Sequence, residues 1–108
     1  MTEVKIITDA EIEGIQPLID LHGAALLKEA YRFKVEQMQK AVRMCDAHLS
    51  ASEDLKDSNP AKYDLLKSEI EKERQDAAII RDGAERRIKV IEEIEKRAEF
   101  KRIAQSLK

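Results

Sequence analysis

Two side chains that could bind a metal ion or carry redox chemistry lie close together in the chain. Cys45 and His48 are three residues apart, so they would share one face of a helix. A structural zinc site needs four ligands, whereas Cys45 is the only cysteine and His22 precedes His48 by 26 residues. Cys45 also falls in a row of apolar residues, where a free cysteine behaves as a small hydrophobic side chain. We therefore expect no metal, no cofactor and a structural role for Cys45.

A cluster of basic residues near the C-terminal end is the clearest sign of a binding function. Such side chains along one flank of a helix can contact the phosphates of nucleic acid or an acidic protein. Glutamates are interleaved with them, however, and pairs such as Glu92 and Lys96 have the i,i+4 spacing that stabilises a helix. A solvated helix face is therefore the reading we favour, with nucleic-acid contact as the alternative. The cluster comprises Arg86, Arg87, Lys89, Lys96, Arg97, Lys101 and Arg102.

The many carboxylates do not form a recognisable catalytic pattern. A di-iron site in a helical bundle requires a glutamate three residues before each histidine, and neither His22 nor His48 has one. The chain contains no glycine-rich phosphate loop, no nucleophile elbow and no zinc-finger spacing. We therefore expect no catalytic residues and no enzymatic activity.

The composition is typical of long helices or a coiled coil. Among 108 residues, 39% are charged and 4% are aromatic, and glycine and proline are scarce. The net charge of −2 argues against nucleic-acid binding by the chain as a whole. The charge is unevenly spread, because residues 1–30 carry six acids and two bases while residues 86–108 carry four acids and eight bases. The length predicts a single helical domain over 1–108.

The expected cellular location of the protein depends on features that the sequence lacks. One cysteine excludes an intrachain disulfide, and no apolar stretch approaches the length of about 20 residues that a membrane span requires. The first residues lack the basic start and apolar core of a secretory signal. We expect a cytoplasmic protein that does not contact membranes.

The N-terminal part predicts an extended arm over 1–7 and a short helix over 8–16. Thr8 and Glu11 have the spacing of a capping box, in which each residue caps the backbone of the other. Pro17 predicts a break near Gln16, because proline lacks an amide donor and disfavours helical geometry in the preceding residue. A long helix is then expected over 18–49.

This long helix has an unusually wide apolar surface. One row with 3–4 spacing includes Leu27, Tyr31, Met38 and Val42, and a second row beside it comprises Leu26, Ala30, Phe33, Ala41 and Met44. Two rows exceed what a simple two-stranded seam requires, which favours a bundle with more than one neighbouring helix.

A polar, acidic stretch predicts a loop over 50–59, followed by a second long helix over 60–106. Asn59 and Pro60 form a good helix start, since asparagine caps free amides and proline suits the first helical position. The apolar phase passes Gly83 without a slip, so we expect one continuous helix with a weak point there. Glu73 and Arg87 occupy apolar slots and indicate either a register-setting pair or a local rotation of the helix.

Together these patterns predict an all-α fold: an antiparallel, coiled-coil-like helical hairpin with a short N-terminal helix, dimerising into a helical bundle. Antiparallel pairing would place the acidic N-terminal third beside the basic C-terminal end. The expected self-association core comprises Leu26, Leu27, Tyr31, Met38, Val42, Cys45, Ile80 and Ile91.

The function expected from this shape is binding. We predict a non-enzymatic protein-interaction module that acts as a helical homodimer, for example an adaptor, an inhibitor or a chaperone-like accessory protein. Its partners would be a second copy of itself and a further, unidentified protein. The alternative is a nucleic-acid-binding accessory protein that uses the basic C-terminal helix.

Overall fold

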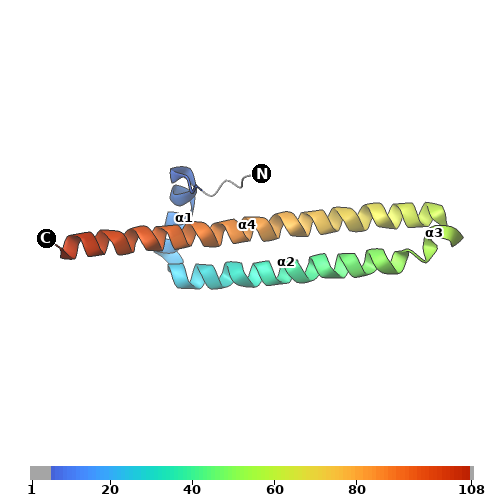
Figure 1. Ribbon diagram of the computed structural model, residues 1–108, viewed down its shortest axis with the longest axis horizontal. Helices are drawn as coiled ribbons and strands as arrows, with labels where there is room; N and C mark the ends of the chain where they lie inside the picture. Colours follow the sequence, from blue (N-terminus) through green and yellow to red (C-terminus); the bar gives the residue numbers. More distant parts are fainter. Residues whose placement is uncertain (1–5, 108) are drawn as a thin grey trace. The chain divides into compact units, whose positions relative to one another are not determined.

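The computed structural model describes residues 6–107, which form helices and no strand (Figure 1). The predicted all-α class is therefore confirmed. In chain order the helices are α1 (Asp9–His22), α2 (Ala24–Ser52), α3 (Leu55–Ser58) and α4 (Pro60–Ser106). Of the predicted arm over 1–7, only Ile6 and Ile7 lie within the described residues, and both are irregular.

The start of α1 confirms the predicted capping box. The Glu11 amide donates to the Thr8 hydroxyl oxygen at 3.2 Å, and the Thr8 amide donates to the Glu11 carboxylate at 3.0 Å. These two bonds satisfy backbone donors that have no partner within the first turn of a helix.

The predicted helix over 8–16 and its break near Gln16 are wrong, because α1 continues through Pro17 to His22. Pro17 and Glu13, whose carbonyl loses its helical donor, are both exposed, so water can satisfy that carbonyl. The helix ends instead at Gly23, whose φ of 89° lies in the region that favours glycine. The Gly23 amide closes the last turn by donating to the Ile19 carbonyl at 2.7 Å.

The first long helix is displaced relative to the predicted range of 18–49. It begins after Gly23 and runs to Ser52, whose hydroxyl donates to the Leu49 carbonyl at 2.8 Å. The predicted loop over 50–59 is correspondingly shorter and contains the single turn of α3. Neither glycine nor proline interrupts residues 50–59, so local polarity alone did not prevent helix formation there.

The second long helix has the predicted bounds. The Asn59 side-chain oxygen accepts a hydrogen bond from the Lys62 amide at 3.2 Å, and Pro60 occupies the first helical position. α4 passes through Gly83 without a break, as the uninterrupted apolar phase predicted.

Contacts in the described part of the chain gather in two compact units, although the sequence predicted one domain over 1–108. The first unit joins the chain up to Arg32 with the segment from Glu85 onward, and the second is Phe33–Ala84. Within each unit, part of α2 packs against part of α4 in opposite directions. Lys28 contacts Glu95 in the first unit, and Asp46 contacts Arg74 in the second.

Each unit has its own small core. In the first, Ile15 of α1 packs with Val90 and Ile91 of α4, and Ile91 is fully buried. In the second, Val42 and Cys45 of α2 and three residues of α4 are buried, namely Tyr63, Ala77 and Ala84. These cores align the helices, and each contains few large side chains.

Candidate interaction surfaces

The structure divides the predicted self-association core between interior and surface. Val42, Cys45 and Ile91 are buried, and Leu27, Tyr31 and Met38 are half-buried. Most of these residues therefore pack against other helices of the same chain. Leu26 and Ile80 differ, with relative exposures of 58% and 46%.

Arg87 lies on the surface, and a register-setting pair with Glu73 across two subunits of a dimer stays a prediction. Its guanidinium carbon is 5.7 Å from the centre of the Tyr31 ring, a distance that permits a cation–π contact. Ile88 is half-buried, and Val90 and Ile91 are buried, which agrees with a local rotation of α4 past Arg87. Glu73, the other charged residue in the apolar series, is also exposed.

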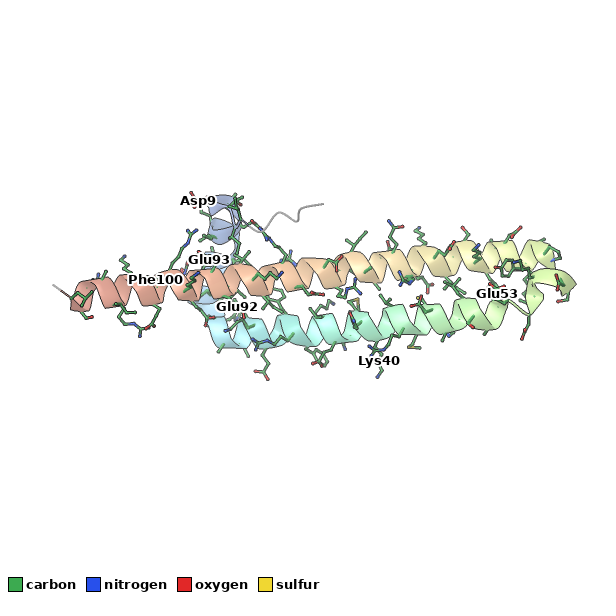
Figure 2. The ribbon with its side chains drawn as sticks, viewed as in Figure 1. Asp9, Lys40, Glu53, Glu92, Glu93 and Phe100 are labelled. Atoms are coloured by element: carbon green, nitrogen blue, oxygen red, sulfur yellow. The ribbon has the colours of Figure 1, made fainter. Side chains whose placement is uncertain are left out.

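The arginines of the basic cluster make contacts within the first unit. Arg86 binds Glu11 of α1, as the predicted pairing of acidic and basic ends requires. Arg97 contacts Glu93 at 2.8 Å and lies 3.9 Å from Asp9, while Arg102 pairs with Glu99. The guanidinium groups of these three arginines are thus partly neutralised by nearby carboxylates (the labelled Asp9 and Glu93 appear in Figure 2).

The lysines of the same cluster are different. Lys89, Lys96 and Lys101 are exposed, and none of them forms an ion pair with another residue in the range 6–107. Lys89 and Lys96 are seven residues apart on α4, so they project from nearly the same side of the helix.

The ion pair between Glu11 and Arg86 shifts both groups from their ordinary protonation behaviour. The hydrogen bonds from Arg86, followed by the one from the Thr8 amide, lower the pKa of Glu11 from 4.5 to about 2. The same contact raises the pKa of Arg86. Glu11 is therefore ionised at neutral pH, and its carboxylate serves as an anchor between α1 and α4.

A similar but more exposed contact joins the helices of the second unit. Arg74 donates to Asp46 at 2.6 Å, and this bond raises the pKa of Arg74. About two turns further along the same pair of helices, Arg81 donates to the Gln39 side-chain oxygen at 3.3 Å. Such exposed pairs contribute mainly to the alignment of the helices.

Cys45 and His48 lie in different surroundings. Cys45 is buried with a free thiol, whereas His48 and His22 are exposed. No group of three or more histidine, cysteine, aspartate or glutamate side chains in residues 6–107 is arranged to hold a metal ion. None of the helices formed by these residues has the length and apolar character needed to cross a lipid bilayer.

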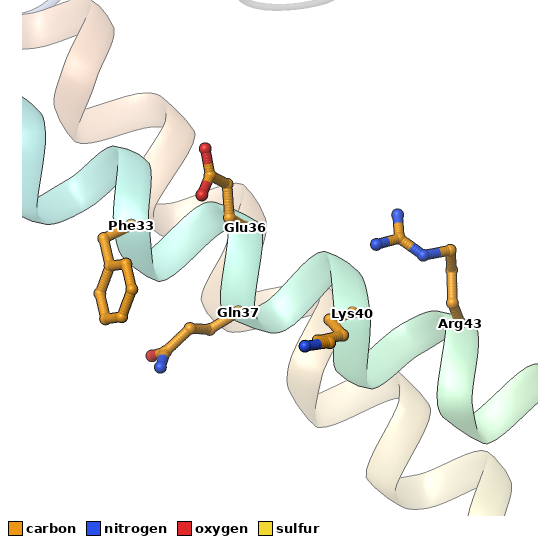
Figure 3. A pocket seen from close by; sticks show the side chains of 5 residues that line it. All are labelled: Phe33, Glu36, Gln37, Lys40 and Arg43. Atoms are coloured by element: carbon orange, nitrogen blue, oxygen red, sulfur yellow. The ribbon is translucent and has the colours of Figure 1, made fainter.

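A further candidate surface in the second unit lies on α2. Phe33, Glu36, Gln37, Lys40 and Arg43 line a shallow hollow, and Figure 3 shows that all five side chains project from this one helix. Phe33 is 60% exposed. In Figure 2 the labelled Lys40 points away from α4. An open hollow on the side of one helix has a shape that can receive another helix.

The sequence singled out the apolar part of this surface but missed its polar part. Of the five lining residues, the second predicted apolar row includes Phe33 and omits Glu36, Gln37, Lys40 and Arg43. The available signal was the spacing of Phe33, Gln37, Lys40 and Met44, which continues the 3–4 pattern through two polar positions.

Comparisons of the chain with protein-family models, with curated proteins and with solved structures found no match.

Proposed function

We propose that this protein is a non-enzymatic protein-interaction module that acts as a helical homodimer in the cytoplasm, in the role of an adaptor, an inhibitor or a chaperone-like accessory protein. The observation that carries the proposal is the number of large apolar side chains at the surface of the helices. Single exposed apolar residues are ordinary, but a row of them on one helix is typical of a helix that binds another surface. In the described part of the chain they are Ile6, Leu18, Leu21, Leu26, Phe33, Met44, Leu65, Ile79, Ile80, Phe100, Ile103 and Leu107.

The chemistry of the carboxylates also favours binding over catalysis. A general acid needs a raised pKa and an enclosed site, so that it still holds a proton at neutral pH. Glu11 has a lowered pKa and is occupied by Arg86. The hollow on α2 is open and contains Glu36 as its single carboxylate.

Two measurements test this proposal. Sedimentation equilibrium at micromolar concentration should give twice the chain mass of 12.4 kDa. Affinity capture from cells that naturally produce the protein should enrich a protein partner reproducibly, relative to an unrelated helical hairpin used as control bait. A monomer of 12.4 kDa that enriches no protein over the control would overturn the proposal.

A second candidate function is nucleic-acid binding by the basic flank of α4. The exposed Lys89 and Lys96, which form no ion pair with another residue of 6–107, favour it. Binding through phosphates should weaken steeply as salt is added, because condensed counterions are released. Charge reversal at Lys89 and Lys96 should abolish a band shift of DNA or RNA at low salt, whereas K72E elsewhere on α4 should not. No band shift by the unaltered protein at low salt would eliminate this candidate.

A further inference from the structure

We infer that one face of α2 is the docking surface for the same face of a second copy, with the two α2 helices antiparallel. This outer face is defined by Phe33, Gln37, Lys40 and Met44, and the inference rests on the homodimer proposed above. Beyond the homodimer itself, the inference specifies the surface that pairs, the relative direction of the two helices and the residues that face each other.

The outer face lies on the side of α2 that the chain itself leaves uncovered. Phe33 and Met44 are 60% and 54% exposed, whereas Val42 and Cys45 on the other side of the helix are buried. Eleven residues make about three turns of an α-helix, so Phe33 and Met44 are aligned along the helix axis. The intervening spacing of four, three and four residues is that of a helix–helix seam.

When two outer faces pair in antiparallel orientation, each residue of one face meets a residue of complementary chemistry on the other. The alignment that places Phe33 against Met44 of the partner subunit also places Gln37 against Lys40 of the partner subunit. Methionine sulfur packs favourably against aromatic rings, and a glutamine oxygen can accept a hydrogen bond from a lysine ammonium. Because the interface is symmetric, each of these contacts occurs twice.

The charges beside the outer face agree with the same alignment. Glu36 and Arg43 flank it on one side, and the antiparallel arrangement brings Glu36 near Arg43 of the partner subunit. A parallel arrangement would instead oppose Lys40 to Lys40 of the partner subunit, which would place two positive charges together in the seam. The outer face and its flank together supply both members of each complementary pair, and this self-complementarity identifies a second copy as the occupant.

Charge reversals at the flanking pair test the inference. E36R and R43E each convert two attractive pairs of the symmetric dimer into repulsive ones, so each should weaken self-association by about tenfold. The double variant E36R/R43E exchanges the charges and should restore the affinity of the unaltered protein. A mixture of the two single variants should likewise form a heterodimer more readily than either forms a homodimer.

Two control variants on α4 have the same changes in net charge. E71R and K72E alter exposed residues of the second unit and should leave the dissociation constant unchanged. Circular dichroism should show that all variants retain the helix content of the unaltered protein. Sedimentation equilibrium at low salt measures the affinities, and added salt should reduce the differences between variants.

The outcomes separate this inference from the homodimer on which it rests. Weakening by both single variants with recovery in the double variant supports the docking of the outer faces. A dimer whose affinity none of these changes alters overturns the inference and retains the homodimer. An unaltered protein that is monomeric at all concentrations overturns both.

Discussion

Arg86 joins the N-terminal helix to α4 through a two-pronged contact with Glu11, from which it is separated by 75 residues. Its Nε donates to one carboxylate oxygen at 2.7 Å and its Nη2 to the other at 2.9 Å. The same Nη2 also donates to the Ile6 carbonyl at 2.8 Å. Since Glu11 also accepts a hydrogen bond from the Thr8 amide, one carboxylate both caps the N-terminus of α1 and holds this helix against α4.

The first prediction concerns the pH dependence of this contact. The pKa of Glu11 is lowered from 4.5 to about 2, so the carboxylate binds a proton more readily in the unfolded chain. The stabilisation it provides is therefore complete above pH 4.5 and is lost as the pH falls toward 2. Replacement Glu11→Gln should lower the free energy of unfolding at neutral pH and flatten its decline over that range, as measured by urea denaturation.

Glu13→Gln is the matched control, because Glu13 lies on the same helix and is exposed. It should leave the denaturation profile of the protein unchanged. Equal pH dependence in the Glu11→Gln variant and the unaltered protein would show that this ion pair does not stabilise the fold.

The second prediction compares two adjacent leucines of α2. Leu27 is half-buried against the core formed by Ile15, Val90 and Ile91, whereas Leu26 is 58% exposed. Leu27→Asp should lower the free energy of unfolding by about 2 kcal/mol or more, since it places an unpaired charge in the core. Leu26→Asp should change it by less than about 0.5 kcal/mol in dilute solution. Urea denaturation followed by circular dichroism makes the comparison, and equal losses in the two variants would contradict it.

The elements of the fold that could be predicted from sequence are those with local physical causes. The capping box at Thr8, the cap at Asn59 and the continuity of α4 each depend on residues within a few positions of one another. Such interactions form in the same way wherever the segment lies, so their sequence pattern is informative.

The incorrectly predicted helix boundaries depend instead on tertiary packing. Proline at position 17 was expected to end a helix, but the loss of one hydrogen bond on the exposed side is compatible with a helix that packs through Ile15 and Ile19. Gly23, which ends that helix, lies inside the range 18–49 for which the sequence predicts one continuous helix. Local helix preference does not show that the helix continues through Pro17 and ends at Gly23, because tertiary packing decides between the two positions.

The candidate surfaces were only partly predictable for a related reason. Charge complementarity indicated that acidic and basic ends would pair, but it did not identify Glu11 and Arg86 among many similar residues. Apolar spacing identified Phe33 and Met44, yet it did not distinguish the row that α4 covers from the row left open. That distinction depends on how α2 is rotated about its own axis within the hairpin, and a second apolar row makes two rotations nearly equivalent.

The third prediction concerns the reactivity of Cys45. Cys45 is 7% exposed, and it belongs to no group of three or more potential metal ligands among the described residues. It should react slowly with a thiol reagent in the folded protein and rapidly in concentrated urea, because only unfolding exposes it. A cysteine introduced at the exposed Ser50 in a Cys45→Ala background should react rapidly in both conditions. Fast reaction of Cys45 in the folded protein, or metal co-purifying in equal amount with the chain, would contradict a purely structural role.

The last prediction uses two glycines with opposite backbone conformations. Gly23 has a φ of 89°, which strains any residue with a side chain, whereas Gly83 lies within continuous α4. A Cβ added at Gly83 would meet no atom within 4 Å. Gly83→Ala should therefore raise the free energy of unfolding by about 0.5–1 kcal/mol, because alanine restricts the unfolded chain and favours the helix.

Gly23→Ala should have the opposite effect, a loss of about 1 kcal/mol or more, although its Cβ also meets no atom within 4 Å. The two variants add the same methyl group without steric contact, so any difference between them reports backbone conformation alone. Urea denaturation at one protein concentration gives both values. A gain in stability from both variants would show that the chain can extend helix through position 23, and that the boundary between α1 and α2 is not held by the glycine.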